Sequence, residues 1–124
     1  MIRIIRILLI VITASSSIEA MADGNYLLQR CKHAVKPAAN LSMSTQRAAI
    51  SYCFGLLQGV REVNRLYEGK NASEAYFCLG SQRLSHSETA KLVVDYLQQN
   101  PQRLHQNESI LTVQALRQAY PCQQ

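Results

Sequence analysis

Four cysteines constrain the fold of this chain more than any other feature of its sequence: Cys31, Cys53, Cys78 and Cys122. An even number of cysteines in a small chain is typical of a disulfide framework formed in an oxidising compartment. No two of them have the C-x-x-C spacing of a zinc or redox motif, and the three histidines lie far apart. The sequence therefore predicts two disulfides, in one of three connectivities, and no metal site or other cofactor.

The first 22 residues have the layout of a secretory signal peptide. Arg3 and Arg6 precede an apolar run, residues 7–12, and the small-residue triplet 20–22 follows. The run is much shorter than the ~20 residues needed to span a bilayer, so a permanent anchor is the weaker interpretation. We predict cleavage after Ala22, export to the periplasm and no membrane insertion of the mature chain.

Without this leader, 102 of the 124 residues remain, enough for one compact domain and too few for two. Loss of two arginines and one glutamate leaves eleven basic and seven acidic side chains, a net charge of +4. The basic residues are scattered from Arg30 to Arg117 and form no run. We therefore expect a single domain, residues 23–124, and no nucleic acid as partner.

Apolar residues recur at helical spacing along the mature chain, and no alternating strand pattern of useful length is present. Ser44, Ser85 and Asn107 are good N-caps, and Glu88 completes a capping box with Ser85. Gly69 is expected to stop the long second helix. The expected helices cover residues 24–34, 45–68, 86–99 and 108–120. The predicted fold class is all-α, a small bundle of about four helices stabilised by two disulfides.

Each helix should bury one stripe of residues three and four apart. The expected inward residues are Tyr26, Leu27, Cys31 and Ala34; then Ala49, Tyr52, Cys53, Leu56, Val60, Val63 and Tyr67; then Ala90, Val93, Val94 and Leu97; and finally Ile110, Val113, Leu116 and Tyr120. Because the first two helices are adjacent in sequence and expected to be antiparallel, we predict the pairs Cys31–Cys53 and Cys78–Cys122.

Gly55 and Gly59 lie four residues apart inside the second helix, although an interior glycine costs ~1 kcal/mol relative to alanine. On one helical face they would form a shallow groove that lets another helix approach closely. Packing within one chain is the favoured interpretation, and a contact between two copies of the chain is the alternative.

Four segments, in this order, resemble the Tai/Rap family of immunity proteins: CFGLLQGV at 53–60, CL at 78–79, VVDYL at 93–97 followed by NP at 100–101, and ALRQAYPC at 115–122. The resemblance implies a mostly helical, disulfide-stabilised periplasmic protein, often a homodimer. It further implies that the partner is a toxin delivered by a type VI secretion system, a peptidoglycan amidase with a papain-like Cys-His site. Immunity would then work by occluding the cleft of that amidase.

The segment 68–82 is the best candidate for the inhibitory surface, because binding residues concentrate on loops held by a rigid scaffold. We predict Tyr76 as the central contact and Glu74 as a rim contact, with Glu68 and Asn71 as further effector-binding residues. Phe77 is either a second aromatic anchor or part of the core. If substitutions in this segment leave the affinity unchanged, the alternative binding surface is the exposed face of the second helix around Arg61, Arg65 and Glu68.

Catalysis by the chain itself has little support, so we predict that it is not an enzyme. Pairing uses all four cysteines, which leaves no free thiol to activate as a nucleophile. His86 is expected to be an exposed residue in the first turn of the third helix, and His33 and His105 are assigned no role. A small periplasmic chaperone or generic binding protein is the alternative function, and a secreted enzyme comes last.

Overall fold

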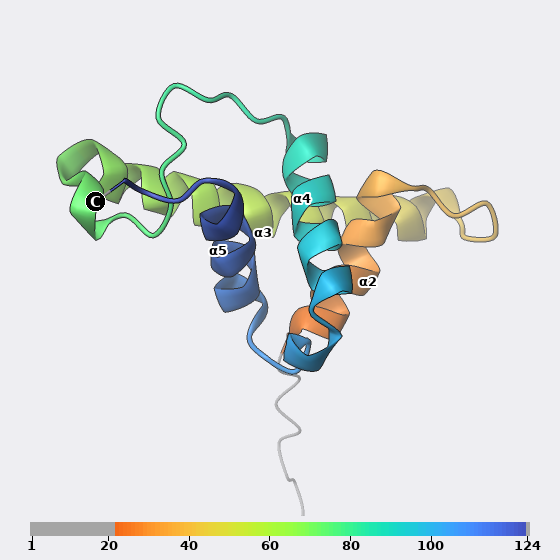
Figure 1. Cartoon of the computed structure of the whole chain (residues 1–124). Helices are drawn as coiled ribbons and strands as arrows, with labels where there is room; N and C mark the ends of the chain where they lie inside the picture. Colours follow the sequence, from red (N-terminus) through yellow and green to blue (C-terminus); the bar gives the residue numbers. More distant parts are fainter. Residues whose placement is uncertain (1–21, 124) are drawn as a thin grey trace, which may run out of the picture.

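The computed structural model of the protein describes residues 22–123, so the predicted leader lies outside the described part except for Ala22. Four α-helices and two short 3₁₀ turns follow one another, and within residues 22–123 the one β-type contact is an isolated bridge between Asp23 and Asn107. The elements are α2 (Gly24–Val35), α3 (Met43–Lys70), η1 (Ala72–Glu74), α4 (His86–Gln99), η2 (Pro101–Arg103) and α5 (Glu108–Ala119) (Figure 1). The all-α prediction and the four helices are confirmed.

Side-chain caps explain where the helices begin. The capping box of α4 is present: Ser85 accepts from the backbone N–H of Glu88, and the carboxylate of Glu88 accepts from the backbone N–H of Ser85. Asn107 caps α5, as predicted, and Asp23 caps α2 through the backbone N–H of Tyr26. These three caps fix the register of the helices around the core.

The predicted ends of the long helix need correction. Its N-cap is Ser42, not Ser44, because the hydroxyl of Ser42 accepts from the backbone N–H of Thr45. Gly69 does not stop the helix either, which runs to Lys70. The end lies at Asn71, whose side-chain oxygen accepts from the backbone N–H and hydroxyl of Ser73 and so starts a new turn.

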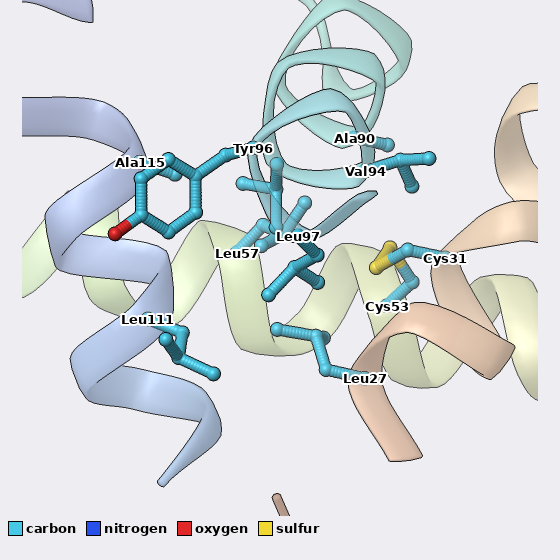
Figure 2. Close-up of a cluster of buried hydrophobic side chains, with 11 residues drawn as sticks. Leu27, Cys31, Cys53, Leu57, Ala90, Val94, Tyr96, Leu97, Leu111 and Ala115 are labelled. Carbon is cyan, nitrogen blue, oxygen red and sulfur yellow. A yellow bond between two sulfur atoms is a disulfide. The ribbon is translucent and has the colours of Figure 1, made fainter. Parts of the chain in front are cut away.

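The main apolar core lies where α2, α3, α4 and α5 meet, and both predicted disulfides are confirmed. Leu27, Leu57, Leu97 and Leu111 are at most 1% exposed, and full burial of such a side chain contributes ~1.5–3 kcal/mol. The Cys31–Cys53 disulfide joins α2 to α3 inside this cluster (Figure 2). We call this part the core.

The predicted stripe of α4 is fully buried, but the stripe of α3 is wrong in its second half. Val63 and Tyr67 are 57% and 43% exposed, while Leu57, Arg61 and Asn64 are buried in their place. Three-and-four spacing fits two lines of residues along this helix, one through Val63 and Tyr67 and one through Arg61 and Asn64. The prediction chose the first line because its residues are more apolar. Arg61 and Asn64 are buried because they bond to a distant segment, which the local pattern does not contain.

The stripe of α5 needs a similar correction. Ile110 is 52% exposed, and the helix buries Leu111, Thr112 and Ala115 together with the predicted Leu116. The hydroxyl of Thr112 is satisfied within its own helix by the backbone carbonyl of Glu108 at 2.8 Å. A threonine that bonds in this way can face the core without an unpaired polar group.

A second, smaller apolar cluster of Phe77, Leu79 and Leu116 lies outside the core. Around it are three segments that we call the arm: the C-terminal part of α3 (residues 61–70), the arm loop (residues 71–85) and the C-terminal residues 120–123. In Figure 1 this end of α3 reaches beyond the other helices, and the C terminus lies beside it. The Cys78–Cys122 disulfide joins the arm loop to the C-terminal residues.

Candidate functional site

Asn64 fixes the backbone of the arm loop at its most exposed aromatic residue. Its amide nitrogen donates to the carbonyl of Phe77 at 2.7 Å, and its amide oxygen accepts from the backbone N–H of Tyr76 at 2.9 Å and of Phe77 at 3.3 Å. The side chain of Asn64 is only 3% exposed, so water competes little for these bonds. Phe77 is therefore held inward, 0% exposed, while Tyr76 stands 61% exposed.

Two further side chains on the same face of α3 hold other points of the arm loop. The guanidinium of Arg61 donates to the carbonyl of Leu84 at 2.9 Å and to the hydroxyl of Thr89 at 3.1 Å. The carboxylate of Glu68 accepts from the backbone N–H of Gly80 at 2.7 Å. Arg61, Asn64 and Glu68 are three, four and seven residues apart and so share one helical face. This face of α3 holds the backbone of the arm loop at three points.

Gly80 is a position where the residue type matters. Its φ of +56° lies in the left-handed region, which glycine adopts without a steric penalty. This turn aims the N–H of Gly80 at Glu68 and lets the chain reverse directly after Leu79, which is buried.

The C-terminal residues complete the support of the loop. Besides the disulfide to Cys122, the backbone N–H of Cys78 donates to the carbonyl of Tyr120 at 2.9 Å. The arm loop is thus tied to α3 on one side and to the C-terminal residues on the other. Its rigidity comes from specific polar bonds and one disulfide more than from apolar burial.

The four predicted effector-binding residues come together on the arm, but they are not equivalent. Tyr76 and Glu74 are exposed. Asn71 is exposed too, but it donates to Glu74 at 3.2 Å and accepts from Ser73, so it organises the η1 turn. Glu68 is half-buried and engaged with Gly80. Of the two interpretations of Phe77, the core interpretation is confirmed.

A surface hollow of about 610 Å³ opens beside Tyr76 and Glu74. The C-terminal part of the chain supplies its other wall, through Arg117, Cys122 and the neighbouring residues. Sequence reasoning missed Arg117 as a site residue. The signal was available in the predicted Cys78–Cys122 pair, which already carries the end of α5 to the arm loop.

Gly55 and Gly59 lie on the outer face of α3. No atom of the described chain lies within 4 Å of a Cβ built on either glycine, apart from neighbouring parts of the same helix. The intramolecular contact favoured from the sequence is therefore not observed among residues 22–123. Val63 and Leu66, 57% and 67% exposed, continue the outer face toward the arm.

The alternative surface around Arg61, Arg65 and Glu68 does not exist as expected. Arg61 is 8% exposed and points under the arm loop, and Glu68 is half-buried against it. Only Arg65 is exposed, and it forms a surface ion pair with Glu62 at 3.7 Å, a type of contact that contributes at most ~1 kcal/mol.

A separate polar cluster ties three helices together at the core. The hydroxyl of Tyr52 on α3 donates to the buried carboxylate of Glu108 on α5 at 2.6 Å. Burial raises the pKa of Tyr52, and the Glu108 carboxylate raises it further. Tyr26 of α2 meets Tyr52 edge to face at 5.1 Å, and Arg30 lies over the ring of Tyr26. The cluster has a structural role, because the hydrogen bond between Tyr52 and Glu108 joins α3 to α5.

The described residues offer no obvious chemical centre. All four cysteines are disulfide-bonded, and residues 22–123 contain no group of three metal-ligating side chains close enough to hold an ion. His86 is exposed in the first turn of α4, as predicted, and stacks on Phe54 at 5.3 Å. No helix among the described residues is long and apolar enough to cross a membrane.

Comparison with known proteins identifies the family. A family model for Rap1a immunity proteins matches residues 23–122, the whole helical domain described above. No curated protein and no solved structure matches the chain. The match confirms the resemblance to the Tai/Rap immunity proteins seen in its motifs, and the chain belongs to the Rap1a immunity protein family.

Proposed function

We propose that this protein is exported to the periplasm, where it binds a peptidoglycan amidase delivered by a type VI secretion system and occludes the active-site cleft with its arm. Membership of an immunity family supports the binding of a cognate effector in general. The observation that carries the finer proposal is the exposed Tyr76 in a loop whose backbone is fixed by the buried Asn64.

A preformed loop suits a cleft inhibitor for an energetic reason. Ordering a mobile loop on binding costs free energy that is then lost from the affinity. In this protein Asn64, Glu68 and the Cys78–Cys122 disulfide hold the loop before any partner arrives. Tyr76 can then enter a cleft at little entropic cost, and a buried tyrosine is among the residues that most often dominate an interface.

The rim of the proposed contact carries both signs of charge. Glu74 and Arg117 both line the hollow beside Tyr76. The carboxylate of Glu74 accepts hydrogen bonds from donors around a Cys-His cleft, and Arg117 meets acceptors there. Such rim contacts set orientation and association rate more than affinity.

The protein acts in this account as a binder without catalytic activity of its own. Its leader, residues 1–22, directs it to an oxidising compartment, where its two disulfides form. The outer face of α3, with Gly55, Gly59 and Val63, is the proposed contact in a homodimer. The same patch would be used on both copies of a two-fold dimer.

Titration of the mature chain against a candidate amidase, sought first in the neighbouring reading frames, tests the proposal. We expect a one-to-one complex and loss of peptidoglycan cleavage in proportion to complex formed. Tyr76→Ala should weaken binding by ~2 kcal/mol, about thirtyfold, and Glu74→Ala by a smaller factor. Ile110→Ala removes a side chain 52% exposed on α5 and serves as the matched control, with unchanged affinity expected.

Two results would contradict the proposal. Unchanged affinity of folded Tyr76→Ala and Glu74→Ala would place the binding surface elsewhere. Binding of many unfolded proteins, without a stoichiometric amidase complex, would instead indicate the chaperone alternative.

A further inference from the structure

The two disulfides differ sharply in their access to solvent. Cys31 and Cys53 are 0% exposed within the core. Cys78 and Cys122 are both partly exposed, and each lines an open hollow at the surface of the arm. The hollow at Cys122 has about 610 Å³ and the hollow at Cys78 about 710 Å³.

Two charged side chains line the hollow at Cys122: Arg117, which attracts a thiolate, and Glu74, which repels one. Arg117 places a permanent positive charge near the disulfide. A thiolate is the attacking species in disulfide exchange, and a nearby arginine stabilises it. The buried Cys31–Cys53 disulfide offers no such approach unless the core opens.

We propose that the Cys78–Cys122 disulfide is a thiol–disulfide exchange site for a dithiol reductant, and that its reduction switches off the arm while the core stays folded. Reduction frees the arm loop from the C-terminal residues, while Arg61, Asn64 and Glu68 still bond it to α3. The loss of effector binding that should accompany it rests on the proposed function.

The exchange takes place in two displacements. A thiolate of the dithiol attacks Sγ of Cys122, so a mixed disulfide forms, the Cys78–Cys122 bond breaks, and Sγ of Cys78 leaves with the electron pair and takes a proton from water. The second thiol of the reductant, deprotonated, then attacks the reductant sulfur of the mixed disulfide and releases Cys122 as a thiolate, which is protonated. Two electrons pass from the dithiol, which ends as a disulfide, to the protein, which ends with two thiols.

Reduction removes the one covalent tie between the arm loop and the C-terminal residues. The hydrogen bond from Cys78 to Tyr120 and the small apolar cluster around Phe77 then have to hold that side of the arm alone. The core keeps its own disulfide and its larger apolar cluster. Local opening of such a weakly packed region does not require global unfolding.

Timed alkylation under native conditions tests the proposal directly. The mature oxidised chain is treated with dithiothreitol, quenched with N-ethylmaleimide at intervals, and mapped by mass spectrometry. We expect labelling of Cys78 and Cys122 at least about a hundredfold faster than labelling of Cys31 and Cys53, whose reduction requires the rare unfolded state. Equal rates for the two disulfides, or faster labelling of Cys31 and Cys53, would overturn the proposal.

Two variants distinguish the effect of the Arg117 charge in the hollow from the effect of a lower net charge on the whole chain. Arg117→Ala should slow the labelling of Cys122 several-fold, while Arg47→Ala, an exposed arginine on the first part of α3, should leave the rate unchanged. Equal slowing in both variants would contradict a role for Arg117 in the hollow.

Binding measurements then connect the site to inhibition. Cys78→Ser/Cys122→Ser should keep the helical circular dichroism and lose at least tenfold in amidase affinity. Bound amidase should shift the reduction equilibrium of the wild-type disulfide toward the oxidised form, since linkage is reciprocal. Undiminished affinity of this double variant would overturn the switch. Failure of the oxidised wild type to bind amidase would instead count against the proposed function, and the alkylation rates would still decide on the exchange site.

Discussion

The core and the arm each contain one disulfide and one apolar cluster, but different forces hold them together. In the core, Cys31–Cys53 is enclosed by side chains such as Leu57 and Leu97 that have almost no exposure. In the arm, a small cluster is supplemented by polar side chains of α3 that bond to loop backbone, above all Asn64. Apolar packing gives the core its stability, whereas directional bonds give the arm its shape.

This difference implies that the two regions fail in different ways. Loss of an apolar side chain in the core should lower the free energy of unfolding of the whole domain. Loss of one of the α3 side chains that bond to the arm loop should release that loop while the helices stay in place. The arm thus presents a loop of defined conformation to a partner, because individual hydrogen bonds fix its backbone.

The largest expected effect is a core truncation, which tests one side of the comparison. Leu97→Ala removes a side chain that is 0% exposed among α2, α3 and α5, and we expect a loss of ~2–5 kcal/mol in the free energy of unfolding. Urea denaturation followed by circular dichroism measures it. Ile110→Ala, at a position 52% exposed, is the matched control and should change stability little. Similar losses in the free energy of unfolding of both variants would contradict the claim that apolar packing in the core stabilises the domain.

The second prediction tests the arm. Asn64→Ala leaves the backbone groups of Tyr76 and Phe77 without their partners, and each unsatisfied buried group costs ~1–3 kcal/mol. We expect faster hydrogen exchange at the N–H groups of Tyr76 and Phe77, weaker amidase binding, and unchanged exchange in α2. Asn40→Ala, in the exposed connection before α3, should have none of these effects. Global unfolding of Asn64→Ala would show that arm and core are one cooperative unit.

The third prediction concerns the outer face of α3, which belongs to neither cluster. Gly59→Ala should raise the free energy of unfolding of the monomer by ~1 kcal/mol, because the added methyl group meets no atom within 4 Å and alanine favours the helix. Urea denaturation at low protein concentration measures this gain. If the glycines form a close dimer contact, light scattering at high concentration should show weaker association in the same variant. A destabilised monomer would contradict the open outer face.

The smallest expected effect is the acid dependence of two helix caps, one at the start of α2 and one at the start of α4 beside the arm loop. The backbone N–H of Tyr26 lowers the pKa of Asp23, and the backbone N–H of Ser85 lowers the pKa of Glu88. A carboxyl whose pKa is lowered in the folded state stabilises it above the unfolded values, here 3.8 and 4.5, and this contribution is lost as the pH falls through the lowered values.

Acid titrations of Asp23→Asn and Glu88→Gln check this dependence. Each variant should lose less stability than the wild type below about pH 5. Hydrogen exchange should place the Asp23 effect in α2 and the Glu88 effect at the junction of the arm loop and α4. A wild-type acid profile in both variants would contradict the assignment of these caps.

The helices and the disulfide pairs could be predicted from the sequence because their signals are simple. The capping box at Ser85 and Glu88, the helical spacing and the even cysteine count each act within a few residues or through one covalent rule. The inner face of α3 was predicted wrongly because Arg61 and Asn64 are buried by contacts with Leu84 and Phe77. A periodicity argument ranks such polar residues as exposed, and nothing local indicates their partners.

The candidate site was predicted in part for a similar reason. Tyr76 and Glu74 stand out because they lie in a tethered loop between the long helix and Cys78. Arg117 enters the site only through the fold, since α5 and the arm loop meet at the Cys78–Cys122 disulfide. Glu68, also predicted as a contact residue, accepts a hydrogen bond from the backbone N–H of Gly80, which no local signal in the sequence indicates.

Hydrogen–deuterium exchange of the mature chain with and without the amidase locates the surface that the amidase covers. We expect slower exchange in the arm loop, residues 71–85, and around Arg117 when the amidase is bound, with α2 and the first part of α3 unchanged. Protection confined to α2 or to the connection before α3, with the exchange of Tyr76 and its neighbours unaltered, would contradict the proposal that the arm occludes the cleft.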